Sequence, residues 1–394
     1  MRARLGSPAS VQTLVGRLPP EGPVAVVRDG DRTVIGLDPS AVIVASGPDA
    51  FPALERLTSG WWAGFLSYDL GRQVERVPGS NATTGIPDVG FARFETRVVI
   101  EPGGGCAIEG DPGAMDRLLA SEPGSDPRTH HEWTSSLDRT AYADAIARIH
   151  EHLLNGDCYQ VNLTRTLTSG PAPDARALSA ALRKANPAPH EAFVRVGGVE
   201  VVSASPECFL RVDGRRVVTR PIKGTSAHAD VLASSAKDRA ENVMIVDLAR
   251  NDLGRVCEYG SVRVPELFAV EKHPGLYHLV STVAGTLRGD VTIAQLVRAT
   301  FPPASVTGCP KPRVLEIIEA LEPVRRGVYC GAVGFVDADR GVCDLNVAIR
   351  TFTITGGRTT LGVGGAIVAD SDPRAEWRET ELKARRLLAI AAGT

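Results

Sequence analysis

The sequence predicts an α+β protein with a largely antiparallel sheet. Short segments rich in Val, Ile and Phe recur along the chain between Gly, Pro and Asp-Gly turn signals, which is typical of strands joined by tight turns. Three longer segments have helical periodicity, but they do not alternate one by one with strands as the helices of a parallel sheet do. With 43% apolar residues in a chain of 394, a large core can form.

Charge and cysteine usage narrow the class of protein. The chain has 44 Lys and Arg against 46 Asp and Glu without a basic run, so we expect no nucleic-acid partner. Neither a secretory signal nor an apolar run near the ~20 residues that span a bilayer is present, so we expect no membrane partner. The seven cysteines never show Cys-x-x-Cys spacing, which argues against zinc and disulfide frameworks. We therefore expect a reduced, cytoplasmic protein.

The N-terminal third is predicted to be β-rich. Asp29-Gly30 is a turn signal, residues 64–72 predict a strand that enters a loop, and residues 90–102 predict another strand. A polar stretch from Glu122 to Thr140 then interrupts the pattern and predicts a linker. We place the domain boundary there, with a β-rich region over 1–133 and a second region over 134–394.

Three segments are predicted as helices. The first covers residues 140–157, begins at Thr140 and ends at Asn155-Gly156. The others cover residues 234–252 and 372–390.

The two later helices each carry neighbouring carboxylates. Asp238 and Glu241 are three residues apart on one helix, and so are Glu376 and Glu379 on the other. Facing pairs of this kind can hold one Mg²⁺, which takes one or two carboxylates and keeps its other positions for water and an anionic substrate. From spacing alone, a surface ion pair such as Glu379 with Lys383 is the commoner explanation.

The first helix is followed by a predicted strand over residues 158–167. Its alternation places Tyr159 and Val161 on one face and Gln160 and Asn162 on the other. From alternation alone, we expect Gln160 and Asn162 to lie on a solvated face.

Residues 199–225 predict a hairpin that turns at Asp213-Gly214. A two-residue turn there would pair Glu207 with Arg220 and Ala204 with Lys223. Strict alternation would then place Glu207 and Lys223 on opposite faces, whereas a bulge or one more loop residue would reverse this parity. Both arrangements stay open at this point.

Individual residues in these segments can carry chemistry. Lysine is rarely buried without a partner, and desolvation of Lys223 would lower its pKa and make it a nucleophile, although lysines near strand ends more often reach water. Glu207 has apolar neighbours, and burial would suit it to general-acid work. A lone histidine such as His278 is more often a hydrogen-bonded core residue than a catalyst. The GVGGAI segment, residues 362–367, lacks the spacing of a dinucleotide or phosphate loop, but it can form a tight turn that presents N–H groups to an anion.

Taken together and in order, several longer motifs resemble the chorismate-utilising enzymes. The resemblance covers roughly residues 134–394, and the first third matches mainly through GFLSYDLGR. It implies two antiparallel sheets packed on each other with helices outside, and a Mg²⁺-dependent site for chorismate. The motifs are GDCYQVNLTR, SASPECFL, RPIKGT, AENVMIVDLARNDLGRV, YHLVSTVAGTL, FPPASVTGCPKPRVLEIIEALEPVRRGVYCGAVGF, AIRT, GVGGAIVADSDP and EWRETELKARRLL.

The resemblance also implies roles by motif position. Glu241 and Glu379 would hold the magnesium ion, with Asp238 and Glu376 in support, and Glu207 would be the general acid that protonates the departing C4 hydroxyl. The residues implied to contact or line the substrate pocket are Gln160, Thr225, His278, Tyr329, Arg350, Gly364, Gly365 and Lys383.

Two positions divide the family. Gln160 stands where members that add water at C2 carry a lysine base, which disfavours isochorismate and salicylate synthesis. Lys223 stands where anthranilate synthases have alanine, and it is similar to the aminodeoxychorismate synthase pattern, in which the lysine amine attacks C2. The resemblance thus implies C4 amination to 4-amino-4-deoxychorismate, on the route to 4-aminobenzoate and folate, with anthranilate synthesis as the alternative.

The source of nitrogen is expected to lie outside this chain. No Cys-His-Glu glutaminase signature is present in the sequence. Ammonia is therefore expected as a substrate, either free or delivered by a separate glutamine amidotransferase subunit, component II.

Overall fold

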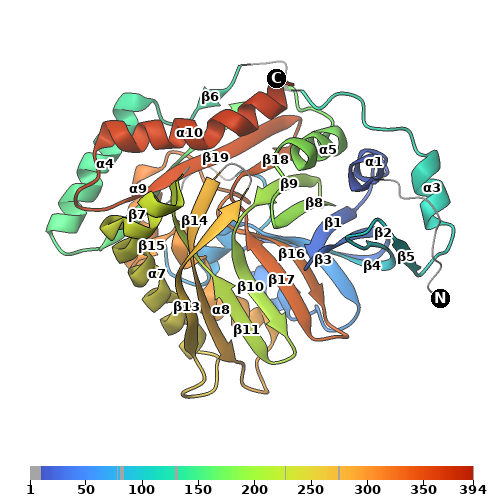
Figure 1. The fold of residues 1–394 in the computed structure, drawn as a ribbon, viewed down its shortest axis with the longest axis horizontal. Coiled ribbons are helices and arrows are strands. Elements are labelled where there is room, and N and C mark those ends of the chain that lie inside the picture. Colours follow the sequence, from blue (N-terminus) through green and yellow to red (C-terminus); the bar gives the residue numbers. More distant parts are fainter. Residues whose placement is uncertain are drawn as a thin grey trace.

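The structure of the protein, a computed structural model, describes residues 10–77, 79, 84–128, 132–226, 228–273 and 276–393. The strands of these residues form one 19-stranded sheet with helices on its outside (Figure 1). The strands are β1 Val24–Asp29, β2 Arg32–Ala45, β3 Trp61–Leu66, β4 Val89–Ile100, β5 Cys106–Glu109, β6 Thr134–Ser135, β7 Gln160–Ser169, β8 His190–Val196, β9 Val199–Ser205, β10 Cys208–Asp213, β11 Arg216–Arg220, β12 Ile222–Ser226, β13 Arg263–His273, β14 Leu276–Thr286, β15 Gly308–Cys309, β16 Ala332–Asp337, β17 Val342–Val347, β18 Thr351–Thr355 and β19 Arg358–Ile367.

The helices lie on the two outer sides of the sheet. None of those described is long and apolar enough to cross a membrane. They are α1 Val11–Gly16, α2 Ala50–Leu54, α3 Ala114–Ala120, α4 Arg139–Leu154, α5 Ala175–Ala185, α6 Ala229–Ser234, α7 Ala236–Gly254, α8 Ile293–Thr300, α9 Lys311–Leu321 and α10 Pro373–Ala392, with 3₁₀ turns η1 Gly47–Asp49, η2 Tyr68–Gln73 and η3 Ala304–Val306.

The sheet folds over on itself into two layers. Hydrogen bonding runs antiparallel from β13 through β14, β11, β10, β17, β16, β3, β4, β2, β1, β8, β9, β18 and β19 to β7. Near the middle of this order, β8 packs against β3, β4 and β16. Apolar side chains such as Phe65, Phe94 and Phe335 fill the space between the layers. The predicted α+β class with packed antiparallel layers is confirmed, while the division at residue 133 stays a prediction.

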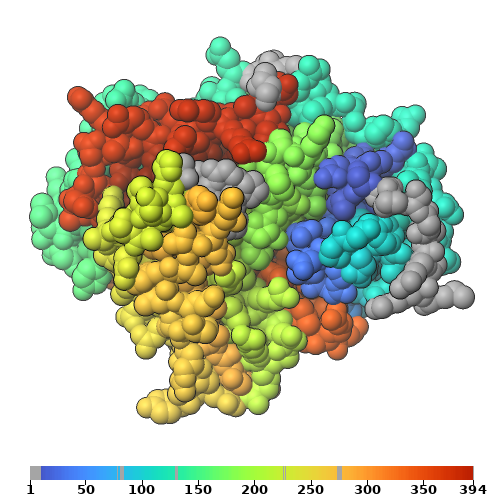
Figure 2. Space-filling view, viewed as in Figure 1, coloured from blue at the N-terminus to red at the C-terminus, as the bar shows by residue number. Residues whose placement is uncertain are grey.

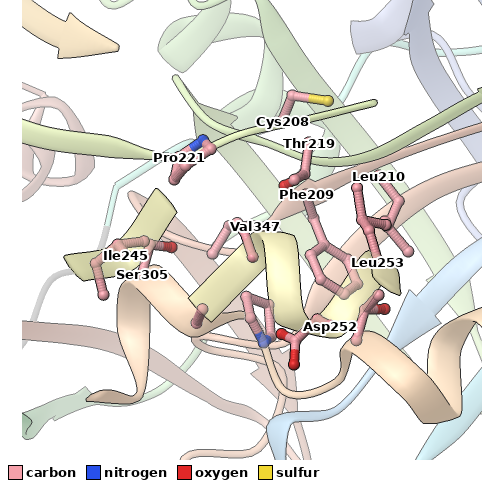
Figure 3. Close-up of a pocket in the computed structure, with 14 residues that line it drawn as sticks. Cys208, Phe209, Leu210, Thr219, Pro221, Ile245, Asp252, Leu253, Ser305 and Val347 are labelled. Carbon is pink, nitrogen blue, oxygen red and sulfur yellow. The ribbon is translucent and has the colours of Figure 1, made fainter. Parts of the chain in front are cut away.

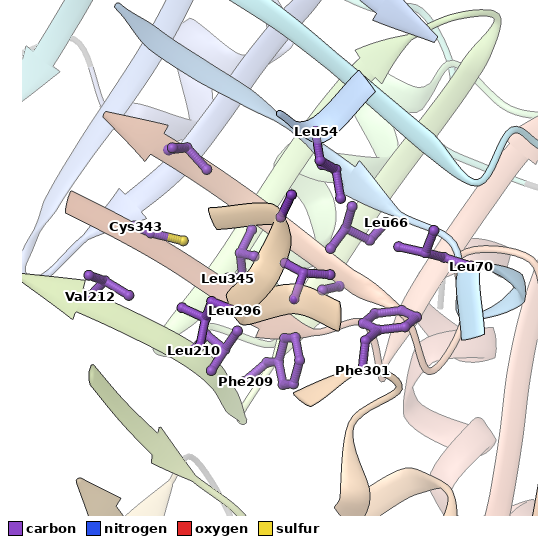
Figure 4. Close-up of a cluster of buried hydrophobic side chains, with 14 of the residues drawn as sticks. Leu54, Leu66, Leu70, Phe209, Leu210, Val212, Leu296, Phe301, Cys343 and Leu345 are labelled. Atoms are coloured by element: carbon purple, nitrogen blue, oxygen red, sulfur yellow. The ribbon is translucent and has the colours of Figure 1, made fainter. Parts of the chain in front are cut away.

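Three further core clusters join the helices to the sheet. In Figure 1, α10 runs along β19 with α4 beside it, and α1 and α5 cover β1 and β9, the two strands on either side of β8. On β7, α4 and α9 pack against Val161 and Leu163. Below the other layer, α2, α7 and α8 enclose a cluster in which Phe209 and Phe301 meet edge to face at 5.9 Å (Figure 4).

The predicted helices are present, with one correction at an N-terminus. We expected Thr140 to begin the first helix, but Asp138 caps α4, and its carboxylate accepts a hydrogen bond from the Ala141 N–H at 2.8 Å. An aspartate is the better cap here because its carboxylate satisfies an N–H that has no partner within the helix. At the other end, Asn155 is the C-cap and Gly156 follows with a φ of +77°, as the Asn-Gly signal predicts.

The expected solvated face of β7 is wrong. The Gln160 side chain is fully buried and Asn162 is 7% exposed, whereas Tyr159, just before the strand, is 71% exposed. β7 is internal because it pairs with β19 on one side and with β15 and β6 on the other, and α4 and α9 cover one of its faces. Alternation separates the two faces of a strand but cannot tell an inner polar face from a solvated one.

The hairpin has a different register from the one we expected. The turn is formed by Gly214 and Arg215, so that Asp213 pairs with Arg216. A bulge between Cys208 and Arg211 shifts the pairing further along β10, as the sequence left open. Such a bulge turns the side chains that follow it to the opposite face.

The clusters predict where substitutions destabilise the fold. Leu66 is fully buried in the cluster of Figure 4, so we expect Leu66→Ala to lower the free energy of unfolding by about 2–5 kcal/mol, because it leaves a cavity. Leu154 is 85% exposed, and Leu154→Ala should change that free energy by less than about 0.5 kcal/mol. Equilibrium urea unfolding measures both, and equal effects of the two substitutions would contradict the packing described here.

Candidate active site

Lys223 is buried on β12, and its side chain points into the protein. The residue is 8% exposed, and its Nζ donates a hydrogen bond to the Ser305 carbonyl oxygen at 3.0 Å. Burial lowers the pKa of Lys223, while the carboxylates of Glu241 and Glu207 oppose that shift. Next to it, Gly224 has a φ of +79°, and a Cβ there would lie 2.8 Å from Cγ of Asp238. Glycine at this position lets β12 pass close to α7 with the lysine facing inward.

Glu207 lies beside Lys223, in the connection between β9 and β10. It is 3% exposed, and burial raises its pKa to about 7. Four groups work against this rise: the Ser305 hydroxyl, which donates a hydrogen bond to the carboxylate, the charge of Lys223, the Ile222 N–H and the charge of Arg350. The carboxyl of Glu207 and the amine of Lys223 therefore face one buried space, and the parity question of the hairpin is answered in favour of a shared site.

A half-buried cation and a buried histidine lie near this space. Nη2 of Arg350, in the connection from β17 to β18, is 3.3 Å from Nε2 of His278 on β14. Burial and the charge of Arg386 lower the pKa of Arg350, and Glu207 opposes this. A desolvated guanidinium of this kind suits a carboxylate ligand. Thr225 pairs with His278 through the backbone, but its side chain lies outside the described part of the structure.

The carboxylates of α7 and α10 converge. Nζ of Lys237 lies 4.0 Å from Glu241 and 3.9 Å from Glu376, and Figure 2 shows α10, in red, in contact with the yellow-green atoms of this region. Burial raises the pKa of Glu241, and the nearby carboxylates of Asp238 and Glu376 raise it further. Carboxylates from two helices thus lie in the same region, which agrees with the spacing of these carboxylates in the sequence.

Glu379 and Lys383 form the i,i+4 ion pair, at 2.7 Å, that spacing favoured. Lys383 also reaches the sheet, where its Nζ donates to the Gly364 carbonyl at 2.8 Å. Partial burial disfavours the charge of Glu379, but Lys383 outweighs this and lowers the pKa of Glu379. The pair is therefore part of the contact between α10 and β19.

The GVGGAI segment is an internal strand, so the tight turn considered from its sequence is wrong. Gly364 and Gly365 pair with Thr164 and Leu163 of β7. A Cβ on Gly364 would lie 2.4 Å from the Leu163 carbonyl oxygen, and one on Gly365 would lie 3.1 Å from Oε2 of Glu376. Glycine here keeps a space open next to the carboxylates of α10.

The carboxylates fit a hard cation, although magnesium itself stays a prediction. In the described part of the chain, no group of three or more His, Cys, Asp or Glu side chains could hold a metal ion by itself. Mg²⁺ does not need one, because it binds through one or two carboxylates and completes its shell with water and substrate oxygens. The ammonium of Lys237 lies between Glu241 and Glu376, where a bound cation would also be expected.

Two predicted pocket residues are buried polar groups. Tyr329 is 8% exposed, and its ring fills the space over Gly362, where a Cβ would be 2.1 Å from Cδ1. The amide nitrogen and oxygen of Gln160 are both buried, and neither has a hydrogen-bond partner among the described residues. Buried polar groups are almost always paired, so this amide is available to a ligand.

The residues behind the site were not predicted from the sequence. Ser305, in η3, contacts both Lys223 and Glu207. It also lines a small cavity with Phe209 and Asp252 (Figure 3). Lys311 is 6% exposed and forms an ion pair with Asp252 at 2.7 Å. A lysine within the apolar pattern of residues 311–321 was a usable signal, whereas nothing in the pattern around Ser305 marks its two contacts.

The protonation of Glu207 can be tested directly. With a pKa of about 7, its carboxyl should be protonated below that pH and ionised above it. We expect an infrared difference spectrum between the wild type and Glu207→Gln to show a protonated carboxyl band that disappears as the pH rises through about 7. A carboxyl already ionised at pH about 5 would contradict the burial described here.

Known proteins resemble this chain in sequence and in fold. Aminodeoxychorismate synthase component 1 of Escherichia coli is 40% identical over 342 residues, which cover 82% of this chain and 75% of that protein. Anthranilate synthase component 1 3 of Haloarcula marismortui is 39% identical over 361 residues, covering 82% and 72%. The crystal structure of anthranilate synthase component I from Streptococcus pneumoniae superimposes with a TM-score of 0.83 at 26% identity, covering 92% of this chain and 93% of that one.

One family model matches nearly the whole chain. It is the model of the chorismate binding enzymes, and its match covers residues 27–389, which include every residue of the site described above. This chain therefore belongs to the family of chorismate-binding enzymes.

Proposed function

We propose that this enzyme aminates chorismate at C4 and releases 4-amino-4-deoxychorismate, on the route to 4-aminobenzoate and folate. Ammonia is the nitrogen donor and is normally supplied by a separate glutamine amidotransferase subunit. The observation that carries the proposal is a buried Lys223 beside a buried Glu207. The relatives named aminodeoxychorismate synthase component 1 support it.

The chemistry consists of two linked displacements. The Lys223 amine forms a bond to C2 of chorismate, the ring double bonds shift, and the C4–O bond breaks. Glu207 gives its proton to the departing hydroxyl, which leaves as water. Ammonia then forms a bond to C4, the double bonds shift back, and the C2–N bond to Lys223 breaks. The incoming nitrogen loses one proton as it bonds to C4, and this proton returns to Glu207. Overall, ammonia enters, water leaves, and both Lys223 and Glu207 are restored.

The pKa shifts suit both roles. A carboxyl with a pKa of about 7 is protonated in a large share of molecules at neutral pH, as a general acid must be. A lysine whose pKa is lowered by burial has more of the neutral amine that can attack carbon. Because the two groups interact, the pH dependence of the rate will report the pair rather than each residue alone.

The remaining residues would bind and orient the substrate. Arg350, next to His278, would hold one carboxylate of chorismate, and the Gln160 amide would find its missing partner in the substrate or in ammonia. Glycines and side chains that would complete the pocket are Gly364, Gly365, Tyr329, Thr225 and Lys383.

Magnesium is part of the proposal. Glu241 and Glu379 would hold it, with Asp238 and Glu376 in support, because these carboxylates converge from α7 and α10 next to the open side of Gly365. When bound, Mg²⁺ would neutralise the ring carboxylate of chorismate and help to position it.

The alternative is amination at C2 with loss of pyruvate, which gives anthranilate. Relatives named anthranilate synthase component 1 support this alternative. In that reaction ammonia attacks C2 directly, and a lysine amine in the same place has no role. A buried lysine that points to the general acid therefore favours C4 amination.

Product analysis decides between the two reactions. We expect purified protein with chorismate, Mg²⁺ and a high ammonium concentration to yield 4-aminobenzoate only when aminodeoxychorismate lyase is added. Lys223→Ala should abolish C4 amination because it removes the attacking amine, and Glu207→Gln should lower kcat by about 10²–10⁴-fold. Lys184→Ala, at an exposed lysine of α5, serves as the control and should leave the rate unchanged. Anthranilate without lyase, unchanged in Lys223→Ala, would favour the alternative.

Metal binding can be measured without turnover. We expect calorimetric titration with Mg²⁺, in the presence of chorismate but without ammonia, to show at least about tenfold weaker binding in Glu241→Gln and Glu379→Gln than in the wild type. Glu381→Gln removes an exposed carboxylate from the same helix and should bind as the wild type does. Equal affinities for all four proteins would exclude these carboxylates as ligands.

A further inference from the structure

Ser305 is the point at which the two reacting groups of the site meet. Its carbonyl oxygen accepts a hydrogen bond from Nζ of Lys223 at 3.0 Å, and its hydroxyl donates one to the carboxylate of Glu207. Lys223 belongs to β12, and Glu207 belongs to the connection between β9 and β10. One residue from a third segment, η3, thus ties together two groups that approach from different strands.

The segment that carries Ser305 is held by two buried cations. On one side, Nζ of Lys311 donates to the carbonyls of Thr300 at 2.9 Å and Pro302 at 3.2 Å. On the other side, Nη1 of Arg326 donates to the Val306 carbonyl at 2.9 Å. These charges are balanced by Asp252 and Glu322, each at 2.7 Å. The position of Ser305 is therefore fixed by contacts that do not involve Lys223 or Glu207.

The two hydrogen bonds have a direction that matters for the chemistry. A carbonyl oxygen only accepts, so Lys223 must place one of its N–H bonds on Ser305, and the lone pair of the neutral amine points elsewhere. The Ser305 hydroxyl also hydrogen-bonds to the Glu207 carboxylate. Ser305 thus limits the directions in which both groups can react.

We propose that Ser305 is the positioning residue that orients Lys223 toward C2 of the substrate and Glu207 toward the departing C4 hydroxyl, and that residues 300–306, anchored by Lys311 and Arg326, are its rigid support. This inference rests on the proposed function, because it assigns Ser305 a task in a reaction that needs both an amine and a general acid.

The cavity behind Ser305 makes a conservative substitution usable. It is lined mostly by apolar side chains, including Phe209 and Ile245, and its volume of about 20 Å³ has room for roughly one water-sized group (Figure 3). Ser305→Thr keeps the hydroxyl and adds a methyl group that this space can receive. Ser305→Ala removes the hydroxyl alone, while the backbone carbonyl remains.

The test compares kcat, KM for chorismate and the pH profile of kcat among variants. In Ser305→Ala we expect kcat to fall by about 10–100-fold, since the general acid loses the hydrogen bond that orients it, with KM changed by less than about threefold. The groups that face Glu207 are Ser305, Lys223, Arg350 and the Ile222 N–H. Losing the Ser305 hydroxyl removes one influence that lowers the pKa of Glu207, so the decline of kcat at high pH should move to higher pH.

Three further variants separate positioning from packing. Ser305→Thr should restore both kcat and the pH profile, and Ser305→Cys, with a weaker donor of similar size, should lie between wild type and Ser305→Ala. Thr359→Val is the control, because the Thr359 hydroxyl is buried on β19 without a partner among the described residues. It removes a buried hydroxyl away from the site and should change neither kcat nor the profile.

Two results would overturn the inference. One is a Ser305→Ala enzyme with the kcat and pH profile of the wild type. The other is an equal loss of kcat in the alanine, cysteine and threonine variants with an unchanged pH profile, which would mean that Ser305 only fills space. Failure of the proposed function is distinct, since it shows in the wild type as anthranilate, whereas failure of this inference leaves the wild-type product at C4.

Discussion

Removing an ammonium group from water costs several kcal/mol unless the group finds a partner or gives up its proton. The surroundings of Lys223 do both: they supply partners and they favour the neutral amine. Burial lowers its pKa, while Glu207, Glu241 and the Ser305 carbonyl supply partners. The same burial raises the pKa of Glu207 to about 7. One desolvated space thus shifts an amine and an acid in opposite directions, and both shifts favour the uncharged forms that the proposed reaction uses.

That desolvated space is a product of the folded-over sheet. Lys223 and Glu207 lie at strand ends in the β9–β12 part of the chain, and the segment of residues 300–306, fixed by Lys311 and Arg326, closes the site from behind. Each buried cation has its own carboxylate, so removing one partner would leave an unpaired charge in the interior. We infer that these ion pairs hold residues 300–306 in place more than they stabilise the fold, because apolar residues would fill the same space without the desolvation of charged groups.

Local signals predicted much of this architecture, and long-range contacts account for the rest. Helix ends were found where a side chain or a glycine marks them, as at Asn155-Gly156, and the cap at Asp138 was missed by two residues. Burial of Gln160 was missed because alternation does not say what covers a face. The role of Ser305 depends on two residues about 80 and 100 positions earlier in the chain, and no local pattern records such a contact. Motif order, in contrast, identified the family before any geometry was known.

Charge balance is a physical reason to propose a cation in this site. Four carboxylates, those of Asp238, Glu241, Glu376 and Glu379, lie near the space that an anionic substrate must enter. Lys237 and Lys383 can offset two of these charges. The remaining two would repel the carboxylates of chorismate at short range in a medium of low dielectric constant, where such repulsion is strongest. A divalent ion offsets both at once and offers open positions to substrate oxygens, which an additional lysine would not do.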